Sequence, residues 1–567
     1  MISCFLMIPH QKKVLRLNQV SFLYCEPNLD FEYEPRVVRK RIGASTNKLR
    51  QTTAEQHHVE FTTIRPEFQP QRNPGPSIPN VLLQEDAKAK AVTYFRIFFT
   101  DAIMDRIALE TNRYHKQKAM LKSRNNAKSG SYSHTIQWKS VKVEDLYAFF
   151  GIVLATGIIR LPELPDYWST KWLFNASDIA TIMTRDRFDQ IWCNIHLVDN
   201  HLAAKHGSLT FDKLYKIRWL LEEMSRLFQF AYQPNQNIAV DEMMVPCKGR
   251  VSFKQYCPMK PIKRGIKVFG CCDRLKAYLL SFFVYEGKAN ADDDENSVSA
   301  VGVCGEVVLR LVHSYVNQNY IVYLDNFFTS LALFKKLLES RVHACGTTRT
   351  NRKGFPVAAV ASTNNKIGTK KAVKGELRSA VVDGIRALGF VDKREVHLLS
   401  TFHGTETSPK ARKQPDGTVK DEEIPIMVQD YNQNMRAVDV RDQQTSYYPC
   451  TRKAKRWWLR LLWWTLDAAV NNAHILFNCY NQPISVREYR ERLIYELIGN
   501  TTRTDHQVNK KRKRPLIGES THELHKIIKL TTKKLCKACK EHQSQYGCDV
   551  CCVGFCVLCF VPYHATL

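Results

Sequence analysis

Acidic residues occur at three points of the chain where secondary structure could bring their carboxylates together. Asp241 follows the apolar run at 238–240, and Asp325 follows the run Tyr-Ile-Val-Tyr-Leu at 320–324. Both runs are short and apolar, and the second is rich in β-branched and aromatic residues, which is typical of buried strands that end at the acid. Asp439 and Asp442 lie three residues apart at the start of a predicted helix, so they share one helix face. Burying such carboxylates is costly unless a cation or hydrogen bonds compensate them.

Two interpretations of these acids are open. In the first, Asp325 merely caps the helix predicted to begin near Thr329. In the second, the acids bind two Mg²⁺ ions roughly 3.5–4 Å apart, which activate the attacking oxygen and stabilise the leaving oxygen in phosphodiester chemistry. Acids on one strand, on a later strand and on a still later helix form the arrangement of RNase H-like nucleotidyl transferases. In that fold the two strands lie side by side, although these two acids are far apart in the sequence.

The surrounding hydrophobic pattern indicates which elements would position the acids. Between about 87 and 234 apolar residues recur at helical spacing, and Trp168 and Trp172 are expected in the core. From 237 the pattern changes to short strands interleaved with helices, which predicts an α/β fold with a mixed sheet. Glycines and short β-like runs then fill 351–430. Helix resumes at 431, and its segment 457–464 is apolar on every face and should be buried.

The composition favours a polyanionic partner. The 567 residues carry a formal charge of +28, from 83 Lys+Arg against 55 Asp+Glu, and this excess suits binding to nucleic-acid phosphates. No stretch is long and apolar enough to predict a membrane-spanning helix, and the N-terminus makes a poor signal peptide. The basic run at 510–514 is either a nuclear localisation patch or a plain linker.

Basic side chains follow the acids in three groups. They could form a rim that binds DNA phosphates, or they could be scattered on a solvated face. The candidate DNA-binding residues are Lys248, Arg250, Lys254, Lys260, Lys263, Lys267, Arg349, Arg352, Lys453 and Arg456.

The C-terminal cysteines have the spacing of zinc ligands. Three Cys-x2-Cys pairs and a histidine crowd into the last 32 residues, more than one tetrahedral ion uses, which predicts two Zn²⁺ ions shared by alternating pairs. The expected ligands are Cys536, Cys539, Cys548, Cys551, Cys556, Cys559 and His564, and an eighth ligand could be His542 or Cys552. The domain could bind DNA or be a zinc site without DNA contact.

The segments around the acids closely resemble those of piggyBac-type transposases. The resemblance rests on residues 237–246 with 247–267, on 323–330, and on 430–439 with Asp442-Gln443. It implies that Asp241, Asp325 and Asp439 are the catalytic, metal-binding triad, with Asp442 a fourth metal-binding acid. It also departs in detail: Ala437 stands where the family commonly has Gly, and two residues rather than three separate Cys556 from Cys559.

The resemblance implies a full domain plan. The expected parts are a disordered or linker arm (1–90), a helical dimerisation or DNA-binding domain (91–235), an RNase H-like core in two parts (236–350 and 431–500) split by a β-rich insertion (351–430), a basic linker (501–530) and a cysteine-rich zinc domain (531–567).

It also implies a function. Such enzymes cleave transposon ends through hairpin intermediates and insert them at TTAA sites, using Mg²⁺ or Mn²⁺. The expected protein is therefore a nuclear, homodimeric DNA transposase that binds terminal repeats and no membrane. The alternatives are a domesticated descendant that binds DNA without cutting it, and a zinc-dependent chromatin interaction protein.

Overall fold

The computed structural model describes residues 62–80, 84–126, 137–174, 178–258, 260–287, 300–360, 373–413, 417–450, 456–499, 527–551 and 553–565. The chain divides into two compact units, 1–503 and 504–567, each with its own apolar cluster. Most of the predicted N-terminal arm and all of the predicted nuclear localisation patch lie outside the described residues. No described helix is long and apolar enough to span a bilayer.

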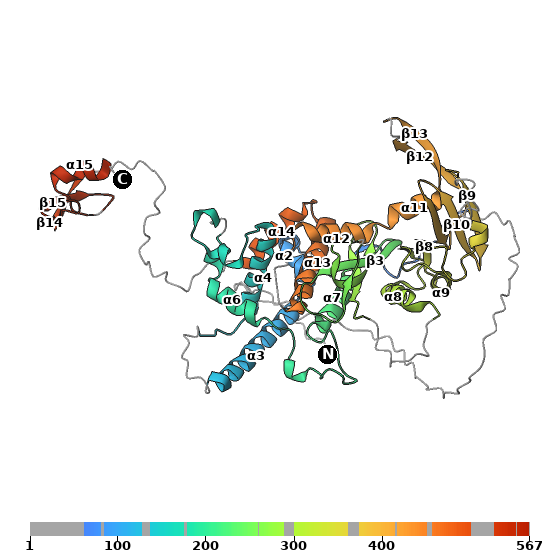
Figure 1. Ribbon diagram of the computed structural model, residues 1–567, viewed down its shortest axis with the longest axis horizontal. Coiled ribbons are helices and arrows are strands. Elements are labelled where there is room, and N and C mark those ends of the chain that lie inside the picture. The colour runs from blue at the N-terminus through green and yellow to red at the C-terminus, as the bar shows by residue number, and fades with distance from the viewer. Residues whose placement is uncertain are drawn as a thin grey trace, which may run out of the picture. The chain divides into compact units, whose positions relative to one another are not determined.

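Helices dominate the first part of the larger unit (Figure 1). They are α1 (Glu85–Lys88), α2 (Ala91–Phe95), α3 (Asp101–Asn126), α4 (Val143–Ile158), α5 (Ile179–Ile182), α6 (Arg185–Asn194) and α7 (Arg218–Ala231). The expectation that both tryptophans of this region are core was wrong for Trp172, which is 85% exposed. It lies on the three-residue 3-10 helix η4 (Trp172–Phe174), none of whose side chains is buried.

A mixed sheet forms the centre of the larger unit. Among the described residues its strands run in the order β4 (Lys254–Tyr256), β5 (Arg264–Asp273), β3 (Asn237–Pro246), β7 (Ile321–Leu324), β8 (His343–Thr347), β11 (Glu395–Ser400), β10 (Ile385–Val391) and β9 (Leu377–Val382). A ninth strand, β6 (Leu279–Val284), also pairs with β5. Strands β3, β7 and β8 are parallel neighbours, and the others pair antiparallel.

Strand β3 is longer than the sequence pattern predicted. It was expected to end at Asp241, but it continues to Pro246 because β5 pairs with it over its whole second half. Asp241 therefore stands within a strand, opposite Gly270. Where a strand ends depends on the neighbouring strand that pairs with it, and the local sequence does not reveal that neighbour.

The glycine-rich region is β-rich, as expected, but it does not stand apart from the core sheet. Strand β11 pairs with β8, so β9, β10 and β11 extend that sheet. A separate hairpin, β12 (Thr407–Lys413) with β13 (Val419–Pro425), lies at the upper right of Figure 1. Helices α8 (Gly302–Val312), α9 (Leu331–Glu339) and α10 (Val357–Val360) occupy the remaining connections.

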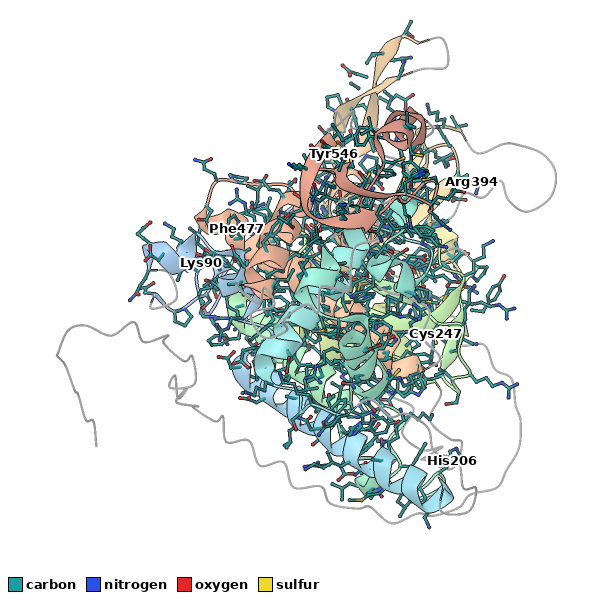
Figure 2. The ribbon with its side chains drawn as sticks, turned by 90° about the vertical axis from the view of Figure 1, so that its left-hand side faces the viewer. Lys90, His206, Cys247, Arg394, Phe477 and Tyr546 are labelled. Carbon is teal, nitrogen blue, oxygen red and sulfur yellow. The ribbon has the colours of Figure 1, made fainter. Side chains whose placement is uncertain are left out.

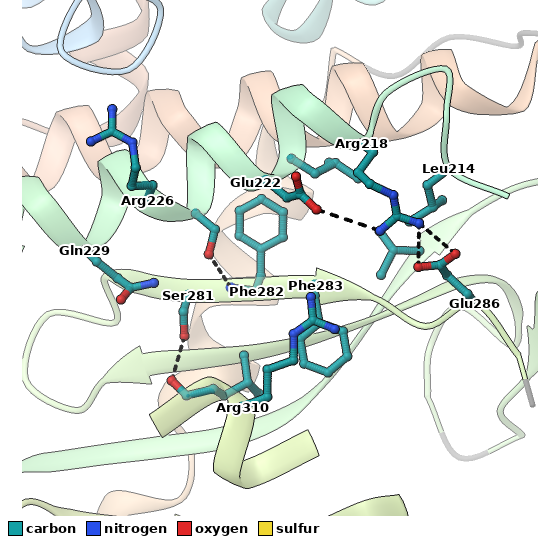
Figure 3. Close-up of a pocket in the computed structure, with 14 residues that line it drawn as sticks. Leu214, Arg218, Glu222, Arg226, Gln229, Ser281, Phe282, Phe283, Glu286 and Arg310 are labelled. Atoms are coloured by element: carbon teal, nitrogen blue, oxygen red, sulfur yellow. Dashed lines mark hydrogen bonds and ion pairs between the residues drawn. The ribbon is translucent and has the colours of Figure 1, made fainter. Parts of the chain in front are cut away.

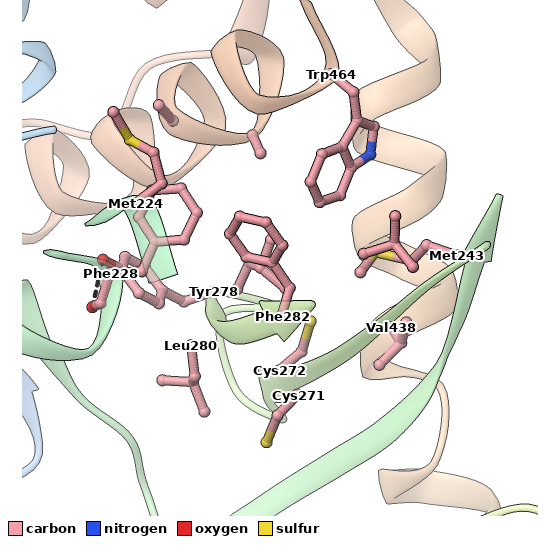
Figure 4. Close-up of a cluster of buried hydrophobic side chains, with 14 of the residues drawn as sticks. Met224, Phe228, Met243, Cys271, Cys272, Tyr278, Leu280, Phe282, Val438 and Trp464 are labelled. Atoms are coloured by element: carbon pink, nitrogen blue, oxygen red, sulfur yellow. Dashed lines mark hydrogen bonds between the residues drawn. The ribbon is translucent and has the colours of Figure 1, made fainter. Parts of the chain in front are cut away.

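Helices complete the larger unit. They are α11 (Ile426–Asn434), α12 (Ala437–Tyr447), α13 (Trp457–Tyr480) and α14 (Val486–Ile498). The predicted burial of the tryptophan-rich helix is confirmed, since nearly all of α13 is buried. Phe477 of α13 packs edge-on against Tyr94 of α2, beside the N-terminal helices (Figure 2). Farther along α13, Trp464 meets Phe282 of β6 in the central core (Figure 4).

The smaller unit contains β14 (Ile527–Leu535), β15 (Gln543–Cys548) and α15 (Val557–Ala565), and β14 pairs antiparallel with β15.

Candidate active site and metal centre

The first two acids belong to adjacent parallel strands: Asp241 lies within β3, and Asp325 directly follows the end of β7. Val240 of β3 is in register with Leu324 of β7, and the next residue along each strand is an acid, Asp241 and Asp325 respectively. Neighbouring strands are about 4.8 Å apart, so this register brings the two carboxylates close. The side-by-side placement expected for these strands is confirmed.

Asp325 does not cap the helix that follows it. Its Oδ1 accepts a hydrogen bond from the backbone N–H of Phe327 at 2.9 Å, so it closes a tight turn. The cap of α9 is instead Ser330, whose hydroxyl accepts from Leu333 N–H at 3.3 Å. The helix-cap interpretation of Asp325 was therefore wrong.

Only glycine fits on β8 behind this turn. A Cβ atom at Gly346 would lie 2.6 Å from the carbonyl oxygen of Leu324 and would also collide with the hydroxyl of Thr329. That hydroxyl donates to the carbonyl of Asp325 at 2.8 Å. β8 thus packs closely against the residues before and after Asp325, and this contact positions the Asp325 carboxylate.

Lys260 joins the third acid to the first. Its ammonium lies 2.8 Å from Asp241 Oδ2 and 3.6 Å from Asp439 Oδ1. Asp439 is in the first turn of α12, which packs against β3, and its side chain is 69% exposed. Lys260 was predicted to contact DNA, but in this structure its charge is turned toward the acids.

The site carries more negative charge than Lys260 neutralises. Burial raises the pKa of Asp241 to about 7, although Lys260 opposes this shift, and the charge of Asp325 adds to it. Burial likewise raises the pKa of Asp442 to about 6. The charge of Lys260 opposes this shift, and the charge of Asp439 adds to it. Burial also raises the pKa of Asp325, and the hydrogen bond from the Phe327 N–H opposes this shift. A divalent cation would relieve this crowding of carboxylates.

The donor chemistry fits Mg²⁺ or Mn²⁺, because hard cations bind carboxylate oxygens. The four carboxylates are nevertheless not gathered around one point. Within the described residues, only four cysteines form a group of three or more ligand atoms that all lie within 4.8 Å of one another. The assignment of Asp241, Asp325, Asp439 and Asp442 as metal ligands therefore stays a prediction.

The predicted basic rim is split between exposed and internally bonded side chains. Lys248, Arg250, Lys263 and Arg349 are exposed, and of these Arg349 also donates to Asn326 Oδ1 at 3.2 Å. The other described ones make internal contacts: Lys254 with the Gly249 carbonyl, Lys267 with Glu242, Arg352 with the carbonyls of Asn326 and Phe327, and Arg456 with carbonyls at 192, 193 and 195. Lys453 lies outside the described residues.

Two charged residues near the acids were missed by the sequence analysis. Glu242 directly follows Asp241, and its charge contributes to the raised pKa of Asp325. Arg441, between Asp439 and Asp442 in the chain, is 1% exposed and donates to the Ala468 carbonyl at 2.6 Å, which ties α12 to α13. The adjacency of Glu242 to Asp241 was a visible signal. No feature of the sequence indicates that Arg441 is buried, because arginine is usually a surface residue.

The smaller unit brings the first and third cysteine pairs together. Sulfur atoms of Cys536, Cys539, Cys556 and Cys559 all lie within 4.8 Å of one another. Backbone N–H groups and His542 lower the pKa of Cys539 to about 6, which favours the thiolate that binds zinc. Four cysteines so placed fit one tetrahedral Zn²⁺ ion. The first and third pairs are alternating pairs, so this grouping is the one that the sequence predicted.

The second predicted zinc ion remains a prediction. Cys548 and Cys551 are close to each other, since the Cys551 N–H contacts the Cys548 sulfur at 3.3 Å. The side chains of His564 and Cys552 lie outside the described residues. His542 sits at the first cluster, with its Nδ1 3.6 Å from the Cys539 sulfur.

A cavity between α7, β6 and α8 has no comparable chemistry (Figure 3). Most of its polar groups satisfy one another: Arg218 binds Glu286, and Ser281 donates to the Leu311 carbonyl. Arg310 stacks over the Phe283 ring at 4.2 Å. We assign no function to this cavity.

Comparison with known proteins agrees with this fold. The family profile described as Transposase IS4 matches residues 90–474, more than half of the chain. The chain belongs to this family of DDE transposases, and within it to the piggyBac transposases.

Curated relatives and a solved structure support the same placement. Human PiggyBac transposable element-derived protein 3 is 27% identical over 426 residues, 73% of this chain and 69% of that protein. Human PiggyBac transposable element-derived protein 2 is 24% identical over 526 residues, 91% of this chain and 81% of that protein. A piggyBac transposase, solved by cryo-EM as a synaptic complex with hairpin DNA, matches with a TM-score of 0.62 at 21% identity, over 86% of this chain and 100% of that one. This likeness confirms the expected mixed α/β fold.

Proposed function

We propose that this protein is a metal-dependent DNA transposase of the piggyBac type. The observation that carries the proposal is that the fold brings three sequence-distant acids into one region. Asp241 and Asp325 follow registered residues on neighbouring parallel strands, and Lys260 links Asp241 to Asp439 on a helix packed across β3. An arrangement of carboxylates with uncompensated charge suits divalent cations and phosphoryl transfer.

In this proposal Asp241, Asp325, Asp439 and Asp442 hold Mg²⁺ or Mn²⁺. The ions would activate the attacking oxygen and stabilise the leaving oxygen at a DNA phosphate. The protein's part is to hold the carboxylates on a rigid sheet and helix, with Gly346 and Thr329 fixing the Asp325 turn. The exposed cations Lys248, Arg250, Lys263 and Arg349 are available to the DNA backbone.

The finer features follow from the family. We infer cleavage through hairpin intermediates, insertion at TTAA sites, a homodimer that pairs two transposon ends, and a nuclear location. The solved piggyBac relative was captured in a synaptic complex with hairpin DNA, which supports DNA binding and assembly for this chain too. The zinc domain, with exposed Lys533, Lys534 and Lys537, would bind the terminal repeats.

A domesticated DNA-binding descendant is the second candidate. The ion pairs of Lys260 with Asp241 and Asp439 favour it, because an ammonium at this position competes with a divalent cation. Acidic residues at all four positions favour the transposase.

The deciding experiment is excision of a plasmid-borne element that carries the DNA ends flanking this coding sequence, with and without Mg²⁺. We expect Mg²⁺-dependent excision by the wild type and none by Asp325→Ala. The matched control is Glu339→Ala, which removes an exposed acid from the helix after Asp325 and should retain activity. Excision that survives Asp325→Ala would refute the triad. Tight binding of the ends without excision by any variant would favour the domesticated descendant.

A further inference from the structure

A buried polar network joins helix α11 to strand β7. Oδ2 of Asp430, on α11, accepts a hydrogen bond from the hydroxyl of Tyr323, which lies on β7 two residues before Asp325, at 2.6 Å. The Nε2 atom of His403 lies 3.2 Å from the same oxygen, and the Ser400 hydroxyl lies 2.8 Å from His403 Nδ1. Tyr323, Ser400 and His403 are at most 4% exposed. These three side chains are therefore inside the protein and cannot contact DNA.

The other oxygen of the Asp430 carboxylate extends the network to strand β3. Asp430 Oδ1 accepts a hydrogen bond from the side-chain amide of Asn434 at 3.0 Å. Asn434 Oδ1 in turn accepts from the side-chain amide of Asn237 at 2.9 Å. Asn237 is the first residue of β3, and Asp241 lies four residues farther along, on the same face of the strand. Hydrogen bonds thus connect Asp430 to both strands that position the first two acids.

Helix α11 also determines where the third acid lies. Only residues 435 and 436 separate the end of α11 from the start of α12, and Asp439 is in the first turn of α12. A shift of α11 along the sheet would therefore move Asp439 relative to the other acids. The buried apolar side chains of α11, Met427 and Val428, do not prevent such a shift by themselves, because the hydrophobic effect is not directional. Buried hydrogen bonds are directional, and a satisfied network specifies one arrangement.

The Asp430 side chain is held in its charged form. Burial favours the neutral acid, but the contacts with His403 and Tyr323 outweigh burial, and the pKa of Asp430 is lowered. An ionised carboxylate only accepts hydrogen bonds, which matches the donors placed around it. Loss of one of these donors should therefore change how α11 is held.

We propose that Asp430 and Tyr323 are positioning residues, which hold α12 and its Asp439 in place relative to Asp325. This inference rests on the proposed transposase function and adds to it two residues that do not touch the reacting atoms. Asp430 is the first residue of the segment 430–439, so the segment would contribute both an acid and the contact that places it.

Two neighbouring tyrosines allow a matched test. Tyr323 and Tyr320 are both fully buried, and each hydroxyl makes a hydrogen bond of 2.6 Å, Tyr323 with Asp430 and Tyr320 with the Gln233 amide. Tyr323→Phe and Tyr320→Phe each remove one buried hydroxyl, so urea unfolding should show similar losses of stability. Only Tyr323→Phe removes a bond to α11.

Cleavage of the DNA ends by the full-length protein is the first measurement. At saturating DNA, Tyr323→Phe should slow Mg²⁺-dependent cleavage about tenfold, because small displacements of reacting groups cost large factors in rate. The Kd for the ends should not change, and Tyr320→Phe should cleave as the wild type does. Asp430→Ala should also slow cleavage, and adding Tyr323→Phe to it should have no further effect, because the bond is already lost. Equal rates for the two tyrosine variants, or additive losses in the double variant, would overturn the proposal.

Binding of Mn²⁺ to the DNA-free protein tests the positioning without cleavage. The electron paramagnetic resonance signal of free Mn²⁺ measures the bound fraction, and loss of binding in Asp325→Ala identifies the site. Residues that orient metal ligands typically change the affinity by about 10–100-fold when they are replaced. Tyr323→Phe should therefore weaken Mn²⁺ binding at least about tenfold, and Tyr320→Phe should leave it unchanged.

The positioning role and the transposase function fail in different ways. Asp325-dependent cleavage at equal rates in Tyr323→Phe and Tyr320→Phe overturns the positioning role and leaves the transposase intact. A wild type that binds Mn²⁺ and the DNA ends without cutting them refutes the transposase. The positioning role then stands if Tyr323→Phe alone weakens Mn²⁺ binding, and falls if the two variants bind Mn²⁺ equally. A wild type that binds no Mn²⁺ refutes both.

Discussion

At the scale of single residues, Asp325 has two separable roles. Its Oδ1 stabilises the turn by accepting from Phe327 N–H, and its negative charge is available to a metal. Asparagine keeps the acceptor and removes the charge. We therefore expect Asp325→Asn to abolish excision while changing the free energy of unfolding by less than about 0.5 kcal/mol, and Asp325→Ala to abolish excision and lose about 1 kcal/mol.

Urea unfolding of both variants beside the wild type measures this difference. Equal loss of stability in the two variants would mean that the turn does not depend on the side-chain acceptor. Activity in Asp325→Asn would mean that the charge is not needed.

At the scale of elements, an ion pair holds α13 and α14 together. Arg490 Nη2 lies 2.9 Å from Asp467 Oδ1, and the two side chains are 0% and 1% exposed. Breaking such a pair leaves the Asp467 charge buried without a partner, so Arg490→Met should lower the free energy of unfolding by about 3–5 kcal/mol. The double variant Asp467→Leu with Arg490→Met should recover much of this loss, because no charge remains buried.

The matched control is Arg487→Met on the same helix, where the pair with Glu491 is exposed. It should leave the urea midpoint unchanged, since exposed pairs contribute little. A midpoint for Arg490→Met equal to that of Arg487→Met would contradict the prediction.

The junction of α3 and α6 should respond to acid. His196 stacks on Tyr114 of α3 and is 3% exposed. Its pKa is lowered to about 4, chiefly by burial. The hydrogen bond to Asn200 opposes this shift, and the charges of Lys216 and Arg456 add to it. The folded state therefore holds neutral His196, whereas the unfolded chain takes up a proton below about pH 6.5. Stability from this group is complete above pH 6.5 and falls as the pH drops toward 4.

The loss should reach about 3 kcal/mol, because one pKa unit corresponds to about 1.4 kcal/mol. Urea unfolding of wild type and His196→Gln at several pH values between 7 and 4 measures it as the difference in slope. Parallel curves for the two proteins would exclude His196 as the titrating group.

At the scale of the whole molecule, the two compact units have separate cores, and among the described residues the four cysteines that could hold a metal ion lie in the smaller one. Cys556→Ser should lower the zinc content and unfold the smaller unit, because such sites stabilise small domains directly. The larger unit should keep its own unfolding transition. Cys193→Ser, an exposed cysteine outside the cluster, is the matched control. Metal analysis and calorimetry of the full chain test this, and an unchanged zinc content in Cys556→Ser would contradict it.

The family, the fold class, the candidate acids and the alternation of the cysteine pairs could all be predicted from the amino-acid sequence. This was possible because each depends on residue types at short spacing, such as an acid after an apolar run or cysteines two residues apart. The three-dimensional contacts were needed to show that β3 continues past Asp241, that the predicted insertion extends the core sheet, and that Lys260 lies between Asp241 and Asp439. These features arise from contacts between residues far apart in the chain, and local periodicity carries no information about which distant partner a strand or a charge will meet.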